Sequence, residues 1–249
     1  MLNTISLEPS SDLNEFQYTR NDLKAEIITF TAATLDGAAA AISPFIDNML
    51  QNREVCNRVV SEIEAADRAG KLSKPCVKYE ETLELPYFMA CIKETLRRDS
   101  PAQTILPRLV SNPGYDLPNG MYIPPNAQMG ASPFIIHRNA EIFGSNPETF
   151  IPSRWIIGEG EGVTDASIKR MEKYGMWWGY GDRECAGKYY AVMEMQKLVV
   201  EMFRRFDIKV AVKEGEDRFT HKRWAVGMFW GQMLALREKD VVGNEKVNL

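Results

Sequence analysis

The sequence contains few of the residues that build metal clusters and disulfide frameworks. Among its 249 residues there are two histidines and four cysteines. The cysteines are far apart and form no CxxC pair, so we expect neither a zinc site nor a disulfide scaffold. Reduced thiols are the expectation for Cys56, Cys76 and Cys91.

Runs of one charge and long apolar runs are also scarce. Basic residues number 30 against 34 acidic ones, which gives a formal net charge of -4, and we expect no nucleic-acid partner. No window approaches the ~20 apolar residues of a membrane span. Residues 1–22 are polar, without a signal-peptide core, and are predicted to be a flexible lead-in. As written, the chain is expected to be soluble and to form a single domain over residues 1–249.

The longest predicted helix covers residues 23–50. Asn21 or Asp22 could cap it. Because it is apolar on nearly all sides, we expect it to be central and buried. Gly37 lowers its helix propensity, and Pro44 removes a backbone donor and is expected to kink it.

The remaining pattern predicts a mainly α fold with a small antiparallel β-sheet. Amphipathic or apolar periodicity predicts further helices. Between residues 105 and 128, short extended runs are separated by turn signals, and the last part of the chain alternates like a strand and a hairpin. The helices are expected at residues 53–69, 85–98, 133–137 and 186–206.

One stretch, "MWWGYGDRECAG" at residues 176–187, concentrates glycine, arginine and cysteine directly before a helix. We call it the cysteine loop. The positive end of that helix favours a thiolate at Cys185. A thiolate there could be a metal ligand or a nucleophile. A nucleophile would need His137 or His221 as its base, and an inert buried cysteine is the third reading.

The other loop residues indicate a flat ligand. Gly181 permits a sharp turn, and Gly187 permits a flat object to approach the helix start. Arg183 could pair with carboxylates on that object. A planar dicarboxylate with a metal centre meets these demands, and haem is the obvious candidate.

The spacing of Trp178, Gly181, Arg183, Cys185 and Gly187 resembles a family signature. It is similar to F-x-x-G-x-R-x-C-x-G, the cysteine loop of the cytochrome P-450 haem-thiolate monooxygenases, with tryptophan in place of phenylalanine. The resemblance implies the C-terminal half of that fold.

Two further motifs extend the resemblance. "ETLR" places Glu94 and Arg97 on one helix face, where the ordinary interpretation is a surface ion pair. "PETFIPSRW" resembles a family coil that supplies a second arginine, Arg154. The resemblance implies a structural network of the three side chains. Removing one partner from such a buried set is expected to cost about 3 to 5 kcal/mol.

For the cofactor, the resemblance implies haem b with Cys185 as the axial ligand of its iron. Arg183 would pair with a propionate of the haem, and His137 and Arg108 are further candidates for propionate contacts. A plain surface arginine is the alternative interpretation of Arg108. Electrons would come from NADPH through an NADPH–cytochrome reductase.

The resemblance also implies insertion of one oxygen atom from dioxygen into an organic substrate. Apolar Ile105 and Leu106, with the hairpin at residues 225–229, correspond to substrate-facing segments and suggest a lipophilic small molecule. Ordinary core packing is the alternative for these residues.

The likeness covers about residues 24–229, and family members are usually longer. The resemblance implies that the N-terminal half, with the anchor that would hold a full-length form in the endoplasmic reticulum membrane, is missing from this sequence. A fragment, a truncated gene model and a degenerate relative are three explanations.

A second departure lies in the long helix. The family pattern A/G-G-x-D/E-T-T corresponds to "ATLDGA" at residues 33–38, where Asp36 keeps the acid but Gly37 replaces the threonine. Thr34 could hold a water instead, or bond back to its own helix. Asp36 and Thr34 are therefore the catalytic candidates. The alternatives to a monooxygenase are a non-catalytic haem-binding or haemless remnant and, as a formality, a cysteine hydrolase.

Overall fold

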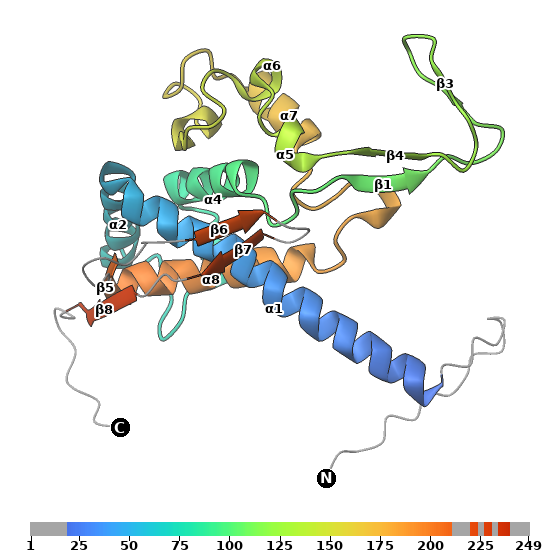
Figure 1. The fold of residues 1–249 in the computed structure, drawn as a ribbon. Coiled ribbons are helices and arrows are strands. Elements are labelled where there is room, and N and C mark those ends of the chain that lie inside the picture. The colour runs from blue at the N-terminus through green and yellow to red at the C-terminus, as the bar shows by residue number, and fades with distance from the viewer. Residues whose placement is uncertain (1–18, 211–219, 224–226, 231–233, 240–249) are drawn as a thin grey trace.

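The computed structural model describes residues 19–210, 220–223, 227–230 and 234–239. Helices dominate these residues, and Figure 1 shows α1 crossing α8 with α4 packed beside them. The predicted mainly helical class is confirmed. The helices are α1 (Arg20–Gln51), α2 (Arg53–Arg68), α3 (Tyr79–Thr82), α4 (Pro86–Arg98), α5 (Pro133–Ile136), α6 (Ala140–Phe143), α7 (Asp165–Tyr174) and α8 (Lys188–Arg205), with 3-10 turns η1 (Pro152–Trp155) and η2 (Gly181–Arg183).

The strands form four separate two-stranded antiparallel sheets in the described residues, where the sequence suggested one small sheet. The pair β1–β4 places Leu106 opposite Ala131 and carries β2–β3 at its far end, as Figure 1 shows. Residues 225 and 226 of the predicted hairpin, the side chains of its residues 227–229, and the side chain of His221 lie outside the described part. The strands are β1 (Leu106–Leu109), β2 (Tyr115–Asp116), β3 (Tyr122–Ile123), β4 (Gln128–Ala131), β5 (Phe206–Val210), β6 (Thr220–Arg223), β7 (Gly227–Trp230) and β8 (Leu234–Glu238), paired β1–β4, β2–β3, β5–β8 and β6–β7.

Helix α1 starts earlier than predicted because its cap is Thr19. The Thr19 hydroxyl accepts from the Asp22 N–H at 3.2 Å, and the Asp22 carboxylate accepts from the Thr19 N–H at 2.8 Å. This capping box satisfies two N–H groups at the helix start. Asp22 therefore completes the cap from the first turn, and the helix continues unbroken through Gly37 and Pro44.

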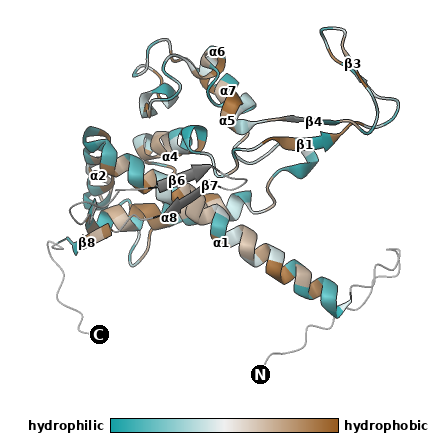
Figure 2. Cartoon of the chain, in the orientation of Figure 1, coloured by the Kyte–Doolittle hydropathy of each residue, from teal (hydrophilic) through white to brown (hydrophobic). Residues whose placement is uncertain are grey.

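The expectation that α1 is buried along its length is wrong for residues 20–36. Leu23, Ile27 and Phe30 are all more than half exposed, and Figure 2 shows this apolar part of α1 projecting from the body. Sequence pattern identifies apolar residues but not the elements that cover them. Helix α1 is long and apolar enough to cross a membrane, which corrects the expectation that no window approaches a span. Core helices of soluble proteins meet the same criteria of length and composition.

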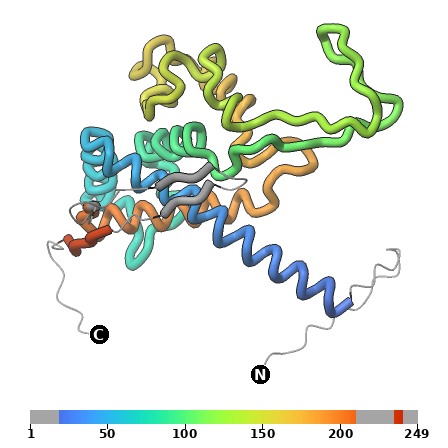
Figure 3. Tube along the Cα trace, viewed as in Figure 1, coloured from blue at the N-terminus to red at the C-terminus, as the bar shows by residue number. Residues whose placement is uncertain are grey.

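The core lies where the C-terminal part of α1 meets α4 and α8. The ring of Phe45 packs edge-on against Phe88 at 5.8 Å and Phe203 at 6.3 Å between centroids. A smaller cluster on the other side of α4 includes Phe143 and Trp155. Helix α4 is therefore packed on two sides, and the trace in Figure 3 shows the chain from α7 returning past it to α8. This packing fixes the helix that carries Glu94 and Arg97.

Candidate functional site

A buried carboxylate, Glu94, is the centre of the first group of predicted residues. Arg97 donates to it through Nε at 2.8 Å, and Arg154 donates through its own Nε at 2.9 Å. The Trp155 indole N–H and the Ile151 backbone N–H add two donors, each at 2.9 Å. Glu94 and Arg97 side chains are 0% exposed and that of Arg154 is 7%, so the structure brings all three together in the interior and not at the surface.

The two arginines also hold backbone carbonyls. Arg97 Nη1 donates to the His137 carbonyl at 2.9 Å and to the Pro147 carbonyl at 2.6 Å, while Arg154 donates to the Phe143 carbonyl. A buried ion pair is costly unless its remaining donors find partners. These bonds meet that requirement and tie the segment at residues 137–154 to α4.

His137 lies next to this network, since its carbonyl accepts from Arg97. Its side chain is fully buried, and its Nε2 accepts from the Met176 N–H at 2.9 Å. Burial, together with the nearby charges of Arg97 and Arg138, lowers the pKa of His137 to about 3, so the ring is neutral at pH 7. Its Nδ1 has no hydrogen-bond partner among the described residues. A role at a propionate stays a prediction for His137.

The cysteine loop folds back on itself. The Cys185 N–H donates to the Trp178 carbonyl at 2.7 Å, and the Glu184 N–H closes the η2 turn on the Gly181 carbonyl at 2.9 Å. Gly181 has φ +66°, in the left-handed region that disfavours a side chain. Gly179, which the motif did not single out, has φ +81°, and a Cβ there would lie 3.1 Å from the Arg183 carbonyl oxygen.

The sulfur of Cys185 stands outside the helix that follows it. Helix α8 begins at Lys188, two residues later than predicted, with Gly187 as its N-cap. Cys185 is exposed, and a Cβ at Gly187 would stand 3.9 Å from its sulfur. The structure thus leaves an exposed thiol beside a residue with no side chain, and the reading of an inert buried cysteine is wrong.

Two cations lie at the cysteine loop. Arg183 is exposed and makes no hydrogen bond or ion pair with another described residue. Arg108, on β1, is also exposed, and its Nη2 donates to the Tyr180 carbonyl at 3.1 Å. The loop therefore combines a thiol ligand, glycine positions and accessible positive charge. This donor set fits a flat, anionic, iron-bearing group such as haem.

Trp178 and the predicted substrate-facing residues occupy different surroundings. Trp178 is half-buried and packs against the main core, where it anchors the loop. It also borders a hollow of about 310 Å³ with Lys173 and Lys188.

Ile105 is 60% exposed, which excludes ordinary core packing for that side chain in the described residues. Leu106 is half-buried. Contact of either with a substrate stays a prediction.

The two catalytic candidates lie on the projecting part of α1. Asp36 and Thr34 are exposed, and the Thr34 hydroxyl donates to the Phe30 carbonyl at 2.8 Å. Of the two roles open to Thr34, the structure shows the bond back to its own helix. Within the described residues, neither side chain makes a hydrogen bond to the cysteine loop.

Sequence reasoning missed the residues that complete these contacts. The Ile151 N–H donates to Glu94 and the Met176 N–H donates to His137, and a bond between a side chain and a distant backbone group leaves no motif. Trp155 lies within the motif that supplies Arg154, but the motif did not show that its indole N–H donates to Glu94. Gly179 carried a weak signal as a third glycine in the cysteine loop.

Comparison with known proteins gives a consistent family. The cytochrome P-450 family model matches residues 2–230. The monooxygenase macH of Penicillium terrestre is 32% identical over 223 residues, which cover 88% of this chain and 41% of the relative. The monooxygenase gsfF of Penicillium aethiopicum is 31% identical, covering 80% of this chain and 38% of the relative. Quiannulatic acid synthase of Emericella variicolor is 35% identical, covering 68% and 32%. The chain therefore spans less than half the length of these curated relatives.

Proposed function

The chain belongs to the cytochrome P-450 family, and on that premise we propose that it is the haem-binding, C-terminal half of a monooxygenase. The observation that carries this proposal is the cysteine loop, where an exposed Cys185 thiol stands beside Gly187 and near Arg183, whose side chain forms no ion pair within the described part of the chain. The reaction would insert one oxygen atom from dioxygen into a lipophilic organic substrate. Fungal monooxygenases among the relatives support the reaction class.

Cys185 would be the ligand of the haem iron. Its backbone is fixed by the 2.7 Å bond to Trp178, whose ring packs on the core, so the sulfur projects from an anchored position. Haem with a thiolate ligand, when bound, supplies chemistry that favours O–O bond cleavage. Gly187 would keep the space beside the sulfur clear of a side chain.

Arg183 and Arg108 would hold the carboxylates of the cofactor. Arg183 has no competing acidic partner among the described residues, so pairing with a propionate would break no existing ion pair. Arg108 is already held beside the loop by the Tyr180 carbonyl, which limits the side-chain entropy lost on binding. The Glu94 network would act as structural support, with electrons supplied from NADPH through a reductase.

Proton delivery would normally use a threonine hydroxyl on the long helix, α1, at the position that Gly37 occupies here. Gly37 provides no hydroxyl, and the Thr34 hydroxyl donates to its own helix. These two observations favour a second candidate function, haem binding without oxygen insertion. Asp36 remains the one acid of the family pattern on this helix.

Isotope-labelled dioxygen separates the two candidates. The chain would be produced with haem available and supplied with NADPH, a fungal cytochrome reductase and a panel of lipophilic compounds under ¹⁸O₂. A monooxygenase gives products carrying one ¹⁸O atom, and Cys185→Ser abolishes them while Cys76→Ser, also an exposed thiol, does not. Haem uptake without labelled product contradicts the monooxygenase and supports the non-catalytic candidate.

A further inference from the structure

One buried residue, His137, forms hydrogen bonds with two parts of the site, one through its backbone carbonyl and one through its imidazole ring. Its backbone carbonyl accepts from Arg97, which carries the Glu94 network, at 2.9 Å. Its imidazole Nε2 accepts from the Met176 N–H, also at 2.9 Å. Arg97 is 40 residues before it and Met176 is 39 residues after it, so the residue joins three distant segments of the chain.

The ring of His137 is held in one state. It is fully buried, with its centroid 5.7 Å from that of Phe143 and 5.3 Å from that of Trp177. Because Nε2 accepts a hydrogen bond, the neutral ring carries its proton on Nδ1. Burial and the nearby charges of Arg97 and Arg138 both oppose the protonated form, which could not accept from Met176.

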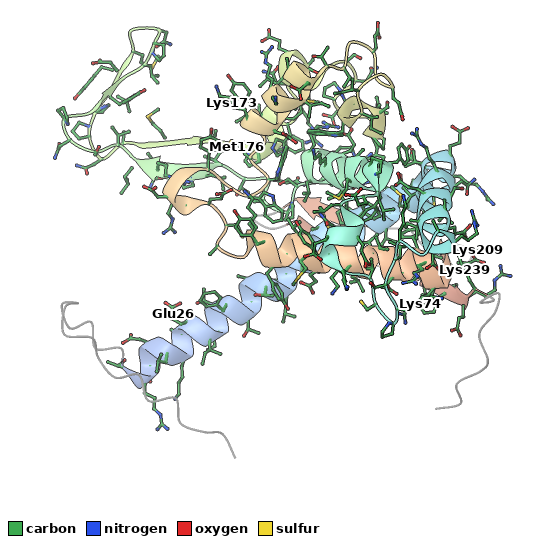
Figure 4. All side chains as sticks on the ribbon, turned by 180° about the vertical axis from the view of Figure 1, so that it is seen from behind. Glu26, Lys74, Lys173, Met176, Lys209 and Lys239 are labelled. Atoms are coloured by element: carbon green, nitrogen blue, oxygen red, sulfur yellow. The ribbon has the colours of Figure 1, made fainter. Side chains whose placement is uncertain are left out.

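Met176 is the first residue of the cysteine loop, and it connects to the sulfur in few steps. Its carbonyl accepts from the Gly179 N–H at 3.1 Å, and the carbonyl of Trp178 accepts from the Cys185 N–H at 2.7 Å. Figure 4 shows Met176 where the chain leaves α7 beside the base of the β1–β4 pair. A displacement of Met176 would move the Trp178 carbonyl and with it Cys185.

We propose that His137 is a positioning residue, which joins the Glu94–Arg97–Arg154 network to Met176 and thereby fixes the backbone of Cys185. The consequence for an iron ligand rests on the proposed function. The mechanical link between the network and the loop does not, since it is made by residues of the chain itself.

Hydrogen–deuterium exchange of the purified chain tests this link through peptides covering residues 175–179 and 184–187. His137→Phe keeps a buried ring but removes the acceptor, and we expect about tenfold faster exchange at Met176, the change expected on losing one hydrogen bond. Exchange at Cys185 should rise about threefold or more. His137→Gln places an amide oxygen near the position of Nε2 and should restore both rates.

Phe143→Leu is the matched control, because it loosens the packing around the ring and keeps the acceptor. Equal acceleration in Phe143→Leu and His137→Phe, or no rescue by His137→Gln, shows a packing role and overturns the proposal. Faster exchange at Met176 without any at Cys185 overturns it as well. If His137→Phe does not fold, His137→Gln must still match the wild type at both amides.

A carbon monoxide spectrum of the reduced, haem-loaded variants distinguishes this inference from the proposed function. We expect His137→Phe to lower the thiolate-type fraction at least twofold, with recovery in His137→Gln. A wild-type chain that binds no haem contradicts the proposed function alone, because the exchange experiment still decides the link. Haem binding with a thiolate-type spectrum unchanged in His137→Phe contradicts the inference alone.

Discussion

Replacing Glu94 by glutamine tests the buried network with almost no change in shape. Oε1 of Glu94 accepts from Arg97 Nη2, Arg154 Nε and the Ile151 N–H, and Oε2 accepts from Arg97 Nε and Trp155 Nε1. If the glutamine oxygen takes the place of Oε1, its NH₂ group faces two donors. Two bonds to a charged group are lost, at about 1.5 to 3 kcal/mol each, and two buried arginines lose their counter-ion. Loss of one partner in a buried ion pair costs about 3 to 5 kcal/mol, which agrees with that sum.

Urea unfolding at pH 7, followed by circular dichroism, measures the effect. With a denaturant slope of about 2 kcal/mol per molar, a loss of about 4 kcal/mol lowers the midpoint by about 2 M. Glu172→Gln is the matched control. Glu172 pairs with Lys93 at 2.7 Å, but the two side chains are 45% and 36% exposed, so its loss should cost at most about 1 kcal/mol.

A Glu94→Gln midpoint close to that of Glu172→Gln would refute the reasoning, because it would mean that the buried charge carries no special stability. If Glu94→Gln does not fold, Trp155→Phe removes a single donor to Glu94 and should cost about 1 to 3 kcal/mol. A Trp155→Phe variant as stable as the wild type would then refute the account.

Three further predictions follow from other sites. The pKa of His137 is lowered, mainly by burial, to about 3 in the folded chain, whereas in the unfolded chain it is about 6.5. As the pH falls below about 6.5, the unfolded chain binds a proton that the folded chain does not bind, and this favours unfolding. The wild type should therefore lose about 2 kcal/mol between pH 8 and pH 5 in urea unfolding that His137→Phe does not lose, and an equal loss in both contradicts this. Glu62 accepts from two backbone N–H groups in the first turn of α4 at 2.8 and 2.9 Å, so Glu62→Ala should cost about 1 to 2 kcal/mol in the same assay, and a neutral substitution contradicts the capping role. Iodoacetamide should modify exposed Cys76 and Cys185 in the native chain. Cys91, whose pKa burial raises strongly, should react only after unfolding, and its native modification, read by peptide mass, would be inconsistent with the core.

Local signals in the sequence predicted most helices to within a few residues. Periodicity and Pro86 place α4 at nearly its observed limits. Helix α7 was not predicted from the sequence, although Thr164 and Ser167 form a capping box at its start. The burial of α1 was overestimated because an apolar composition does not show which other elements cover the helix.

In the candidate site, too, residues in sequence motifs were predicted, and contacts that depend on the folded chain were not. The motifs placed Glu94, Arg97 and Arg154 in one network, since each lies in a recognisable pattern. They did not reveal the bond from Met176 to His137, because an imidazole that accepts from a backbone N–H leaves no repeated spacing. The role of Gly179 likewise depends on its φ of +81° and on its approach to a carbonyl, which are properties of the folded loop.

The central claim is that Cys185 is the ligand of a haem iron, and one spectrum tests it most directly. The chain would be produced with haem available, reduced and exposed to carbon monoxide, alongside Cys185→Ser and the exposed-thiol control Cys76→Ser. The account predicts a thiolate-type Soret band in the wild type and in Cys76→Ser, and its loss in Cys185→Ser. A folded wild-type chain that takes up no haem, or a Cys185→Ser spectrum identical to that of the wild type, would contradict it.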